Sequence, residues 1–383
     1  MSFKKIIKKV PWLRQPAKIA YDGLRESRAN KKIKDFLINE MPFTRECPAN
    51  FEVGHEPTIR CNLECKMCYQ RQTRSLRQAE LDAPGVLKIY QNIAPKTSEI
   101  KIVGGEPLMR QDLIELIEFW SQKNIPVAIQ TNLTLITPSF VEKLKKFKNV
   151  KAFLTSLDGP AEIHNAVRGV PNAFERLTRA IKLIKQEMPS TEISIFSMIL
   201  IDDSLAQAYQ VCTIAKNLGI GSVQFLFEQV NTAANVADSQ KMLAKNLGWS
   251  KSDYRINTQV RENIFVGADT NKIKNDLQAL RRYGAKIGCF ANFVPHNFYK
   301  NLDVYFGLKE KRIFCNKLLS PQVRIVQTGD VVWCDILERS FGNLTQILLK
   351  EIWLSRDYQN FRKFIKENSL PICRRCCKAF YVD

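Results

Sequence analysis

The sequence predicts an α/β fold: an open, partial (β/α)6 barrel of the TIM type, followed by a small C-terminal domain that contains a β-hairpin. Between residues 51 and 230, six apolar, β-branched segments alternate with segments of helical periodicity. This alternation indicates a parallel sheet with right-handed crossovers. Six strands are too few to close an eight-stranded barrel, so we expect a sheet that stays open at one side.

The individual elements follow from periodicity and from the residues that begin and end them. A proline opens the predicted helix 138–147, and Gly219 ends the predicted helix 204–217, as the backbone preferences of these residues lead one to expect. The predicted strands cover residues 51–60, 99–103, 127–131, 150–157, 192–200 and 222–227, and the other predicted helices cover residues 83–93, 111–123 and 173–186. Polar motifs follow the first four strands, at the edge where parallel sheets place their active sites.

Four regions are expected along the chain. A basic extension covers residues 1–50 and the barrel covers residues 51–230. Residues 231–311 form a linker and helical region, because they are polar and lack clear strands up to residue 290. The C-terminal domain covers residues 312–383, where Gly329-Asp330 between two apolar runs predicts the hairpin.

Charge and cysteine content indicate the cellular compartment and the possible partners of the protein. The 383 residues carry a net charge of +20 and eleven cysteines, with no run of eighteen apolar residues and no signal peptide. Such cysteines indicate a reducing cytoplasm and metal binding rather than disulfides. Residues 1–34 hold eleven Lys and Arg against two acidic residues, a local charge of +9. This segment either forms a solvated helix packed on the barrel or contacts an anionic inner membrane face or a lipid-linked substrate. Contact with nucleic acid is a less favoured alternative.

The first motif is a cysteine triad directly after the first strand. Cys61, Cys65 and Cys68 form a C-x3-C-x2-C run. Three thiolates can hold three corners of an iron–sulfur cube, which leaves the fourth iron open to a small molecule. The run resembles the cluster loop of the radical S-adenosylmethionine (SAM) superfamily, and the resemblance implies a 4Fe–4S cluster that binds SAM. The alternative is a zinc site, for which His55 is the available fourth ligand.

Two further motifs extend the resemblance to the SAM pocket. Gly104-Gly105-Glu106-Pro107 is similar to the GGEP motif that holds the methionine amino group, and two glycines also let the backbone approach a ligand closely. Residues 155–160 resemble the fourth-strand segment of family members that carry further clusters. The resemblance implies that Ser156 and either Arg168 or Arg179 bind the SAM carboxylate, that Asn132 contacts the ribose, and that Met67 packs on the adenine.

A second cysteine set lies near the C-terminus. Its spacing, C-x13-G-x4-C with a distant C-x2-C, resembles the twitch domain, a shortened form of the SPASM domain. The resemblance implies one auxiliary 4Fe–4S cluster with Cys315, Cys334, Cys373 and Cys376 as ligands, where Cys377 is an alternative to Cys376. A structural zinc site is the other interpretation of four thiolates.

The remaining cysteines are less informative. Cys212 lies on the apolar face of a predicted helix and is expected in the core. Cys289 is either a buried structural thiol or a hydrogen donor to a substrate radical, as in some radical SAM epimerases.

The resemblance implies that SAM is cleaved reductively to a 5′-deoxyadenosyl radical that removes hydrogen from the substrate, with electrons from a donor such as flavodoxin or ferredoxin. We expect an oxidation, epimerisation or bond-forming modification of a small, sugar or lipid-linked molecule. The alternatives are a maturase of a ribosomally made peptide and a non-catalytic zinc or iron–sulfur module. An RNA-modifying enzyme is disfavoured because no RNA-binding motif accompanies the charge.

Overall fold

The computed structural model describes residues 46–70, 80–199, 205–262, 267, 269–295 and 298–382, with short helical pieces between residues 31 and 39. Residues 1–30 of the basic segment lie outside the described residues, so the contact of this segment with a membrane, lipid or nucleic acid stays a prediction. Within the described chain, every helix is too short or too polar to cross a membrane.

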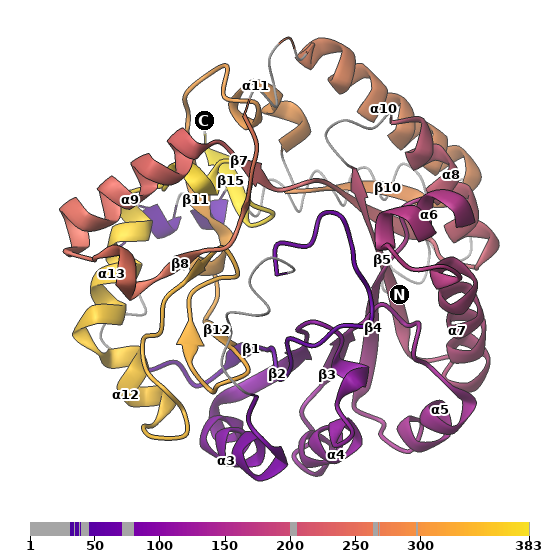
Figure 1. Ribbon diagram of the computed structural model, residues 1–383, viewed down its shortest axis with the longest axis horizontal. Coiled ribbons are helices and arrows are strands. Elements are labelled where there is room, and N and C mark those ends of the chain that lie inside the picture. The colour runs from indigo at the N-terminus through magenta and orange to yellow at the C-terminus, as the bar shows by residue number, and fades with distance from the viewer. Residues whose placement is uncertain are drawn as a thin grey trace, which may run out of the picture.

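A nine-stranded sheet organises the molecule, in the order β10-β6-β5-β4-β3-β2-β1-β12-β13. All six predicted strands are present and parallel, and they lie side by side in chain order. Their bounds are β1 (Phe51–His55), β2 (Thr97–Ile102), β3 (Val127–Gln130), β4 (Val150–Ser156), β5 (Glu192–Ile199) and β6 (Ser222–Phe227). The sheet curves around a central space with its helices outside (Figure 1), which confirms the α/β fold class.

Two further parallel strands extend the sheet beyond the predicted six. β10 (Phe290–Val294) pairs with β6, and β12 (Gln322–Ile325) pairs with β1. The expectation that residues 231–311 form only linker and helix is therefore wrong for β10. Its five residues, interrupted by Asn292, are too short for a clear pattern, and they form a strand by pairing with the edge of β6 and packing against α10. The predicted hairpin is confirmed, because β12 pairs antiparallel with β13 (Val331–Val332).

Helices cover the outer face of the sheet. The barrel helices are α3 (Ala83–Ile93), α4 (Leu113–Gln122), α5 (Pro138–Leu144), α6 (Ala161–Arg168), α7 (Ala173–Glu187), α8 (Ala206–Asn217) and α10 (Thr270–Ile287). Helix α6 was not predicted, since its eight residues carry few apolar side chains. Each amphipathic helix buries one face, as α7 does with Leu177, Ile181 and Ile184.

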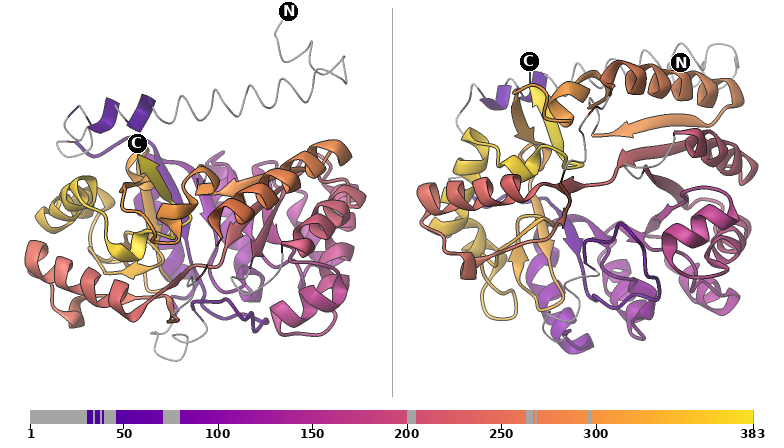
Figure 2. Two further views of the ribbon diagram at one scale, coloured as in Figure 1. Left: turned by 90° about the horizontal axis from the view of Figure 1, so that it is seen from above. Right: turned by 45° about the horizontal axis from the view of Figure 1, so that its top comes forward.

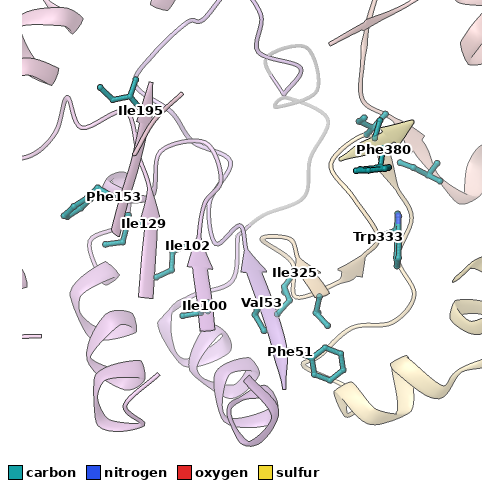
Figure 3. Close-up of a cluster of buried hydrophobic side chains, with 14 of the residues drawn as sticks. Phe51, Val53, Ile100, Ile102, Ile129, Phe153, Ile195, Ile325, Trp333 and Phe380 are labelled. Carbon is teal, nitrogen blue, oxygen red and sulfur yellow. The ribbon is translucent and has the colours of Figure 1, made fainter. Parts of the chain in front are cut away.

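Strand alternation separates an apolar outer face from a polar inner face. Val53, Ile100, Ile102 and Ile325 are buried against the helices and belong to one continuous core (Figure 3). The residues between them, such as Gly54, face the interior of the barrel, because successive side chains of a strand point to opposite sides.

The C-terminal part packs beside α9 (Ala233–Leu247) at the open side of the barrel (Figures 1 and 2). Trp249, Trp333, Phe341, Tyr358 and Phe361 form an aromatic cluster between these segments. The elements of this part and of the preceding region are α11 (Leu302–Tyr305), α12 (Leu349–Leu354), α13 (Arg356–Glu367), β7 (Val230–Asn231), β8 (Arg255–Ile256), β9 (Gln259–Val260), β11 (Arg312–Cys315), β14 (Leu337–Glu338) and β15 (Ala379–Val382).

Candidate active site

The loop with Cys61, Cys65 and Cys68 follows β1 at the carboxyl edge of the sheet, and all three thiols are half-buried. The end of α6 holds the middle of the loop. The backbone N–H groups of Glu64 and Lys66 donate to the carbonyls of Arg168 and Val167, each at 3.0 Å. Helix carbonyls at this end have no partner within the helix, so the loop satisfies them. The unpredicted helix α6 is therefore part of the support of the cysteine loop.

Gly104 and Gly105 lie against the chain that leads into this loop. A Cβ atom would come within 2.3 Å of the Thr58 carbonyl at Gly104 and within 2.2 Å of the Arg60 carbonyl at Gly105, and Gly104 has a φ of +129°. The N–H of Gly105 donates to Thr58 and that of Glu106 to Arg60. The glycines thus let this turn approach the backbone that leads into the cysteine loop.

Glu106 is fully buried behind the glycines. One carboxylate oxygen accepts from the Thr131 hydroxyl at 2.6 Å and the other from the Asn132 N–H at 2.7 Å. Burial raises the pKa of Glu106 to about 7, while the hydrogen bonds from Thr131 and Asn132 oppose this rise. Through its hydrogen bonds with Thr131 and Asn132, Glu106 connects the end of β2 to the end of β3.

Asn132 reaches the cysteine loop itself. Its side-chain amide donates to Asn62 at 2.9 Å, and its carbonyl oxygen accepts from the N–H and the hydroxyl of Thr134. The Asn62 amide in turn donates to the Thr134 hydroxyl at 2.8 Å. The structure therefore places Asn132 beside the residue that follows Cys61, where it orients the loop.

A buried ion pair supports the second cysteine of the triad. The Arg168 guanidinium donates from Nε to Asp158 at 2.7 Å, and its Nη1 lies 3.7 Å from the Cys65 sulfur. His164 is 3.3 Å from the same Asp158 oxygen. Asp158 is buried, yet the charge of Arg168 and the hydrogen bond from His164 hold its pKa at about 2. Burial raises the pKa of Cys65, and Arg168 counteracts this effect, which favours the thiolate.

The other predicted SAM contacts fall into two groups. Ser156 ends β4 on the inner face of the sheet, and Met67 is half-buried in the cysteine loop, so both lie at the carboxyl edge. Arg179, the alternative to Arg168, is exposed on α7 in the outer helix layer. Its proposed contact with SAM is wrong, because α7 turns its other face to the sheet.

Sequence reasoning missed two residues that anchor the loop from a distance. Glu80 accepts from the Ile59 N–H at 2.9 Å and from the Arg60 guanidinium at 3.1 Å. The Gln259 amide of β9 donates to the Lys66 carbonyl at 2.9 Å, so the region between the two domains touches the cysteine loop. Both are single polar residues outside any motif, and no sequence signal distinguishes them from surface residues.

His55 is not placed as a fourth metal ligand. It lies on the outer face of β1, fully buried, with Nδ1 2.9 Å from the Tyr90 hydroxyl of α3. Burial lowers its pKa to about 3, so it is neutral at physiological pH. Among the described residues, no group of three or more His, Cys, Asp or Glu side chains is placed to hold a single metal ion, as a zinc site would require.

The second cysteine set assembles from four separate segments. Cys315 ends β11, Cys334 follows β13, Cys373 ends the 3-10 helix η8 (Pro371–Cys373), and Cys376 follows it in a turn. β11 pairs with β15, which brings Cys315 opposite Ala379, three residues after Cys376. Cys315, Cys373 and Cys376 line one small pocket together with apolar residues such as Ile313 and Phe314.

The charges of these thiols act on one another. Burial raises the pKa of Cys373, and the nearby thiols of Cys315 and Cys334 raise it further. The pKa of Cys376 is raised by its hydrogen bond with Cys377 and by burial, and then by Cys373 and Cys315. The pKa of Cys377 is lowered to about 7 by the hydrogen bond with Cys376 and by the charges of Lys378 and Lys101, while burial and Asp335 oppose this effect. Cys376 also lines the pocket with Cys315 and Cys373, whereas Cys377 is not among its lining residues, which favours Cys376 over Cys377 as the fourth ligand.

The structure does not support Cys289 as a hydrogen donor to a substrate. It is fully buried beside Cys212, between α8 and α10, in the outer layer of the barrel. Its burial agrees with the alternative prediction that Cys289 is a structural thiol, and Cys212 lies in the core as expected.

The donor sets fit iron–sulfur clusters. The first offers three half-buried thiols on one loop with a guanidinium at the Cys65 sulfur. The second offers three thiols around one pocket and a fourth, Cys334, near enough to Cys373 to raise its pKa. Thiolates are the usual ligands of such clusters, and nearby cations stabilise them.

Comparison with known proteins agrees with this geometry. The model of the radical SAM superfamily matches residues 55–213, and that of the SPASM iron–sulfur cluster-binding domain matches residues 315–377. The chain is 28% identical over 334 residues to the AdoMet-dependent heme synthase of Oleidesulfovibrio alaskensis, covering 85% of this chain and 79% of the relative. It is 30% identical over 151 residues to the subtilosin biosynthesis protein AlbA of Bacillus subtilis, covering 37% and 32% of the two chains.

Among solved structures, SuiB of Streptococcus suis bound to S-adenosylmethionine superimposes with a TM-score of 0.61 at 16% identity, covering 98% of this chain and 82% of that one. This likeness shows a shared fold. A radical SAM domain joined to a SPASM domain uses SAM and 4Fe–4S clusters as cofactors. The chain belongs to the radical SAM superfamily and carries a C-terminal SPASM-type iron–sulfur domain.

Proposed function

We propose that this radical SAM enzyme removes hydrogen from a small molecule held inside the barrel, between the two cysteine sets, and that the net reaction is an oxidation. One observation carries the proposal. A polar chain joins the two sets across the inner wall. The Gln70 amide, after the first set, donates to Glu56, and Arg324 forms ion pairs with Glu56 and with Asp335, beside Cys334. A substrate in this interior would have one set on either side.

The proposed cofactor ligands follow the motifs. Cys61, Cys65 and Cys68 would hold the SAM-binding cluster, and Cys315, Cys334, Cys373 and Cys376 the auxiliary one. Met67, Gly104, Gly105 and Ser156 would line the SAM site. When bound, the reduced cluster and SAM supply a 5′-deoxyadenosyl radical that takes a hydrogen atom from carbon, and the second cluster supplies an electron acceptor.

The protein residues position the first loop. Arg168 holds a positive charge at the Cys65 sulfur, and Asp158 keeps that guanidinium in place. Glu106 and Asn132 hold the end of β3 against the loop through hydrogen bonds of 2.7 and 2.9 Å. We propose these four as positioning residues, since their polar atoms already have protein partners.

Anaerobic reconstitution tests the proposal directly. We expect about eight irons per chain, from two four-iron clusters, and 5′-deoxyadenosine when reduced protein is incubated with SAM. An iron content of about four, unchanged by Cys334→Ala, would remove the auxiliary cluster from the proposal. Absence of 5′-deoxyadenosine in fully loaded protein would contradict SAM cleavage.

A peptide maturase is the second candidate. It is favoured by the local identity with AlbA, a protein of bacteriocin biosynthesis. The two candidates differ in the substrate that accelerates SAM cleavage. A short synthetic precursor peptide that increases the yield of 5′-deoxyadenosine and acquires a new mass would favour the maturase.

A further inference from the structure

We propose that Lys101, Gly54 and Arg324 form a binding site for an anionic group of the substrate, a carboxylate or a phosphate, on the inner wall of the barrel. This inference rests on the proposed function and specifies the substrate class of that site. The three residues lie on three neighbouring strands and belong to none of the sequence motifs.

Strand register places the three residues side by side. Gly54 of β1 is paired with Lys101 of β2 on one side and with Arg324 of β12 on the other. Residues paired across parallel strands project from the same face, and the residues on either side of them, such as Ile100, Ile102 and Val53, are buried against the helices. Lys101 and Arg324 therefore flank Gly54 on the inner face, with their Cα atoms about 10 Å apart, which is two strand spacings.

Gly54 leaves open space between the two cations. A Cβ atom built there would have only the Val323 carbonyl within 4 Å, at 3.9 Å, and its φ lies outside the range that requires glycine. The contrast with Gly104 and Gly105 is direct, because their Cβ atoms would collide with backbone. The backbone therefore does not require glycine at position 54, and the missing side chain creates room for a group bound between Lys101 and Arg324.

Among the described residues of this wall, Arg324 has carboxylate partners and Lys101 has none at ion-pair distance. Arg324 is matched by Glu56 at 2.8 Å and Asp335 at 2.5 Å, and Lys317 and Lys378 lie within two residues of Cys315 and Cys376. In the described chain, no carboxylate lies within ion-pair distance of Lys101. Its pKa is lowered to about 8 by burial and then by Lys378 and Arg324, while Asp335 and the Cys377 thiol oppose this effect.

The hydrogen-bonding capacity fits an oxyanion. A guanidinium has five N–H donors, and Arg324 uses Nη2 toward Glu56 and Nε toward Asp335, so Nη1 remains. The Lys101 ammonium has three donors on a flexible stem. An anion over Gly54 would gain charge-assisted hydrogen bonds from both sides, in a partly buried place where such bonds are strong.

A labelling experiment tests the site without knowledge of the natural substrate. Holoenzyme is treated with acetic anhydride, and acetylation of each lysine is followed by mass spectrometry with malonate, inorganic phosphate or neutral malonamide added. With a dissociation constant of about 1 mM, about 10 mM malonate slows acetylation of Lys101 about tenfold. Lys241, whose side chain is 78% exposed, serves as the internal control and keeps its rate.

The anion that protects at the lower concentration distinguishes a carboxylate from a phosphate substrate. Gly54→Leu fills the open space and should abolish protection while Lys101 still reacts, and Gly54→Ala should weaken protection only in part. Equal acetylation of Lys101 with and without both anions would overturn the proposal and leave Lys101 as a counter-charge of the second cysteine set. Acetylation does not depend on SAM cleavage, so this failure is distinguishable from failure of the proposed function.

Discussion

The two cysteine sets of this protein are built in opposite ways. The first spans eight residues of one loop, and polar contacts from the ends of strands and of helix α6 hold it, among them Arg168 at Cys65 and Asn132 at Asn62. The second spans residues 315–376, and an aromatic cluster beside Cys334 holds it. A local set needs only orientation from its neighbours, whereas a dispersed set needs tertiary packing before its members meet.

The largest expected effect separates the two sets chemically. Cys65→Ala should abolish SAM cleavage and lower the iron content to about half, because the second set still binds its cluster. Cys334→Ala is the matched variant and should also lose about half of the iron but retain SAM cleavage. Iron analysis and chromatography of 5′-deoxyadenosine measure both, and retained cleavage in Cys65→Ala would contradict the assignment of the first set.

Loss of aromatic packing should weaken the hold of the second cysteine set on its iron and leave the first set unaffected. The Phe361 ring is fully buried and stacks on Trp249, with Trp333 and Phe341 at 5.7 and 5.3 Å between ring centroids. Phe361→Ala should lower the free energy of unfolding by about 4 kcal/mol through the cavity it leaves. Urea unfolding measures this loss, and the iron of the second set should be released first. Earlier release from the first set would break the comparison.

Loss of an ionic contact should affect the first set alone. Asp158→Ala leaves the buried Arg168 without its carboxylate, which should cost about 3 kcal/mol. The freed guanidinium no longer has a fixed position at Cys65, so SAM cleavage should slow while the second cluster keeps its spectrum. Asp158→Asn, which keeps the shape, serves as the control for packing. A normal cleavage rate in Asp158→Ala would show that Arg168 needs no positioning.

A pH titration sharpens the comparison, because a buried histidine lies directly before the first loop. The folded pKa of His55 is lowered to about 3, so its stabilising contribution is complete above the ordinary pKa and is lost as the pH falls toward the folded pKa. Between pH 6.5 and 4.5 the wild type should lose about 2.5 kcal/mol more than His55→Gln. Urea unfolding at each pH measures the difference, and parallel curves would contradict a neutral buried histidine.

The smallest expected effect concerns the support behind the glycines. Thr131→Val removes the hydroxyl that donates to Glu106 at 2.6 Å. The loss should cost about 1–2 kcal/mol and raise the pKa of Glu106 further, because a bond that favours the carboxylate is gone. Thermal unfolding at pH 6 and pH 8 measures the change, which should be larger at pH 8. A loss independent of pH would show that Glu106 does not titrate in this range.

Local pattern was enough for much of this protein. The six strands 51–227, most barrel helices, the hairpin and both cysteine spacings follow from periodicity, turn residues and thiol spacing, since each depends on residues close together in the chain. Tertiary structure alone decided that β10 and β12 join the barrel sheet, that Cys289 is buried in the helix layer, and that Arg168 rather than Arg179 meets the cysteine loop. These outcomes depend on which strand edge or helix face a residue meets across the fold, and strand pairing and burial between distant segments leave no periodic trace in the sequence.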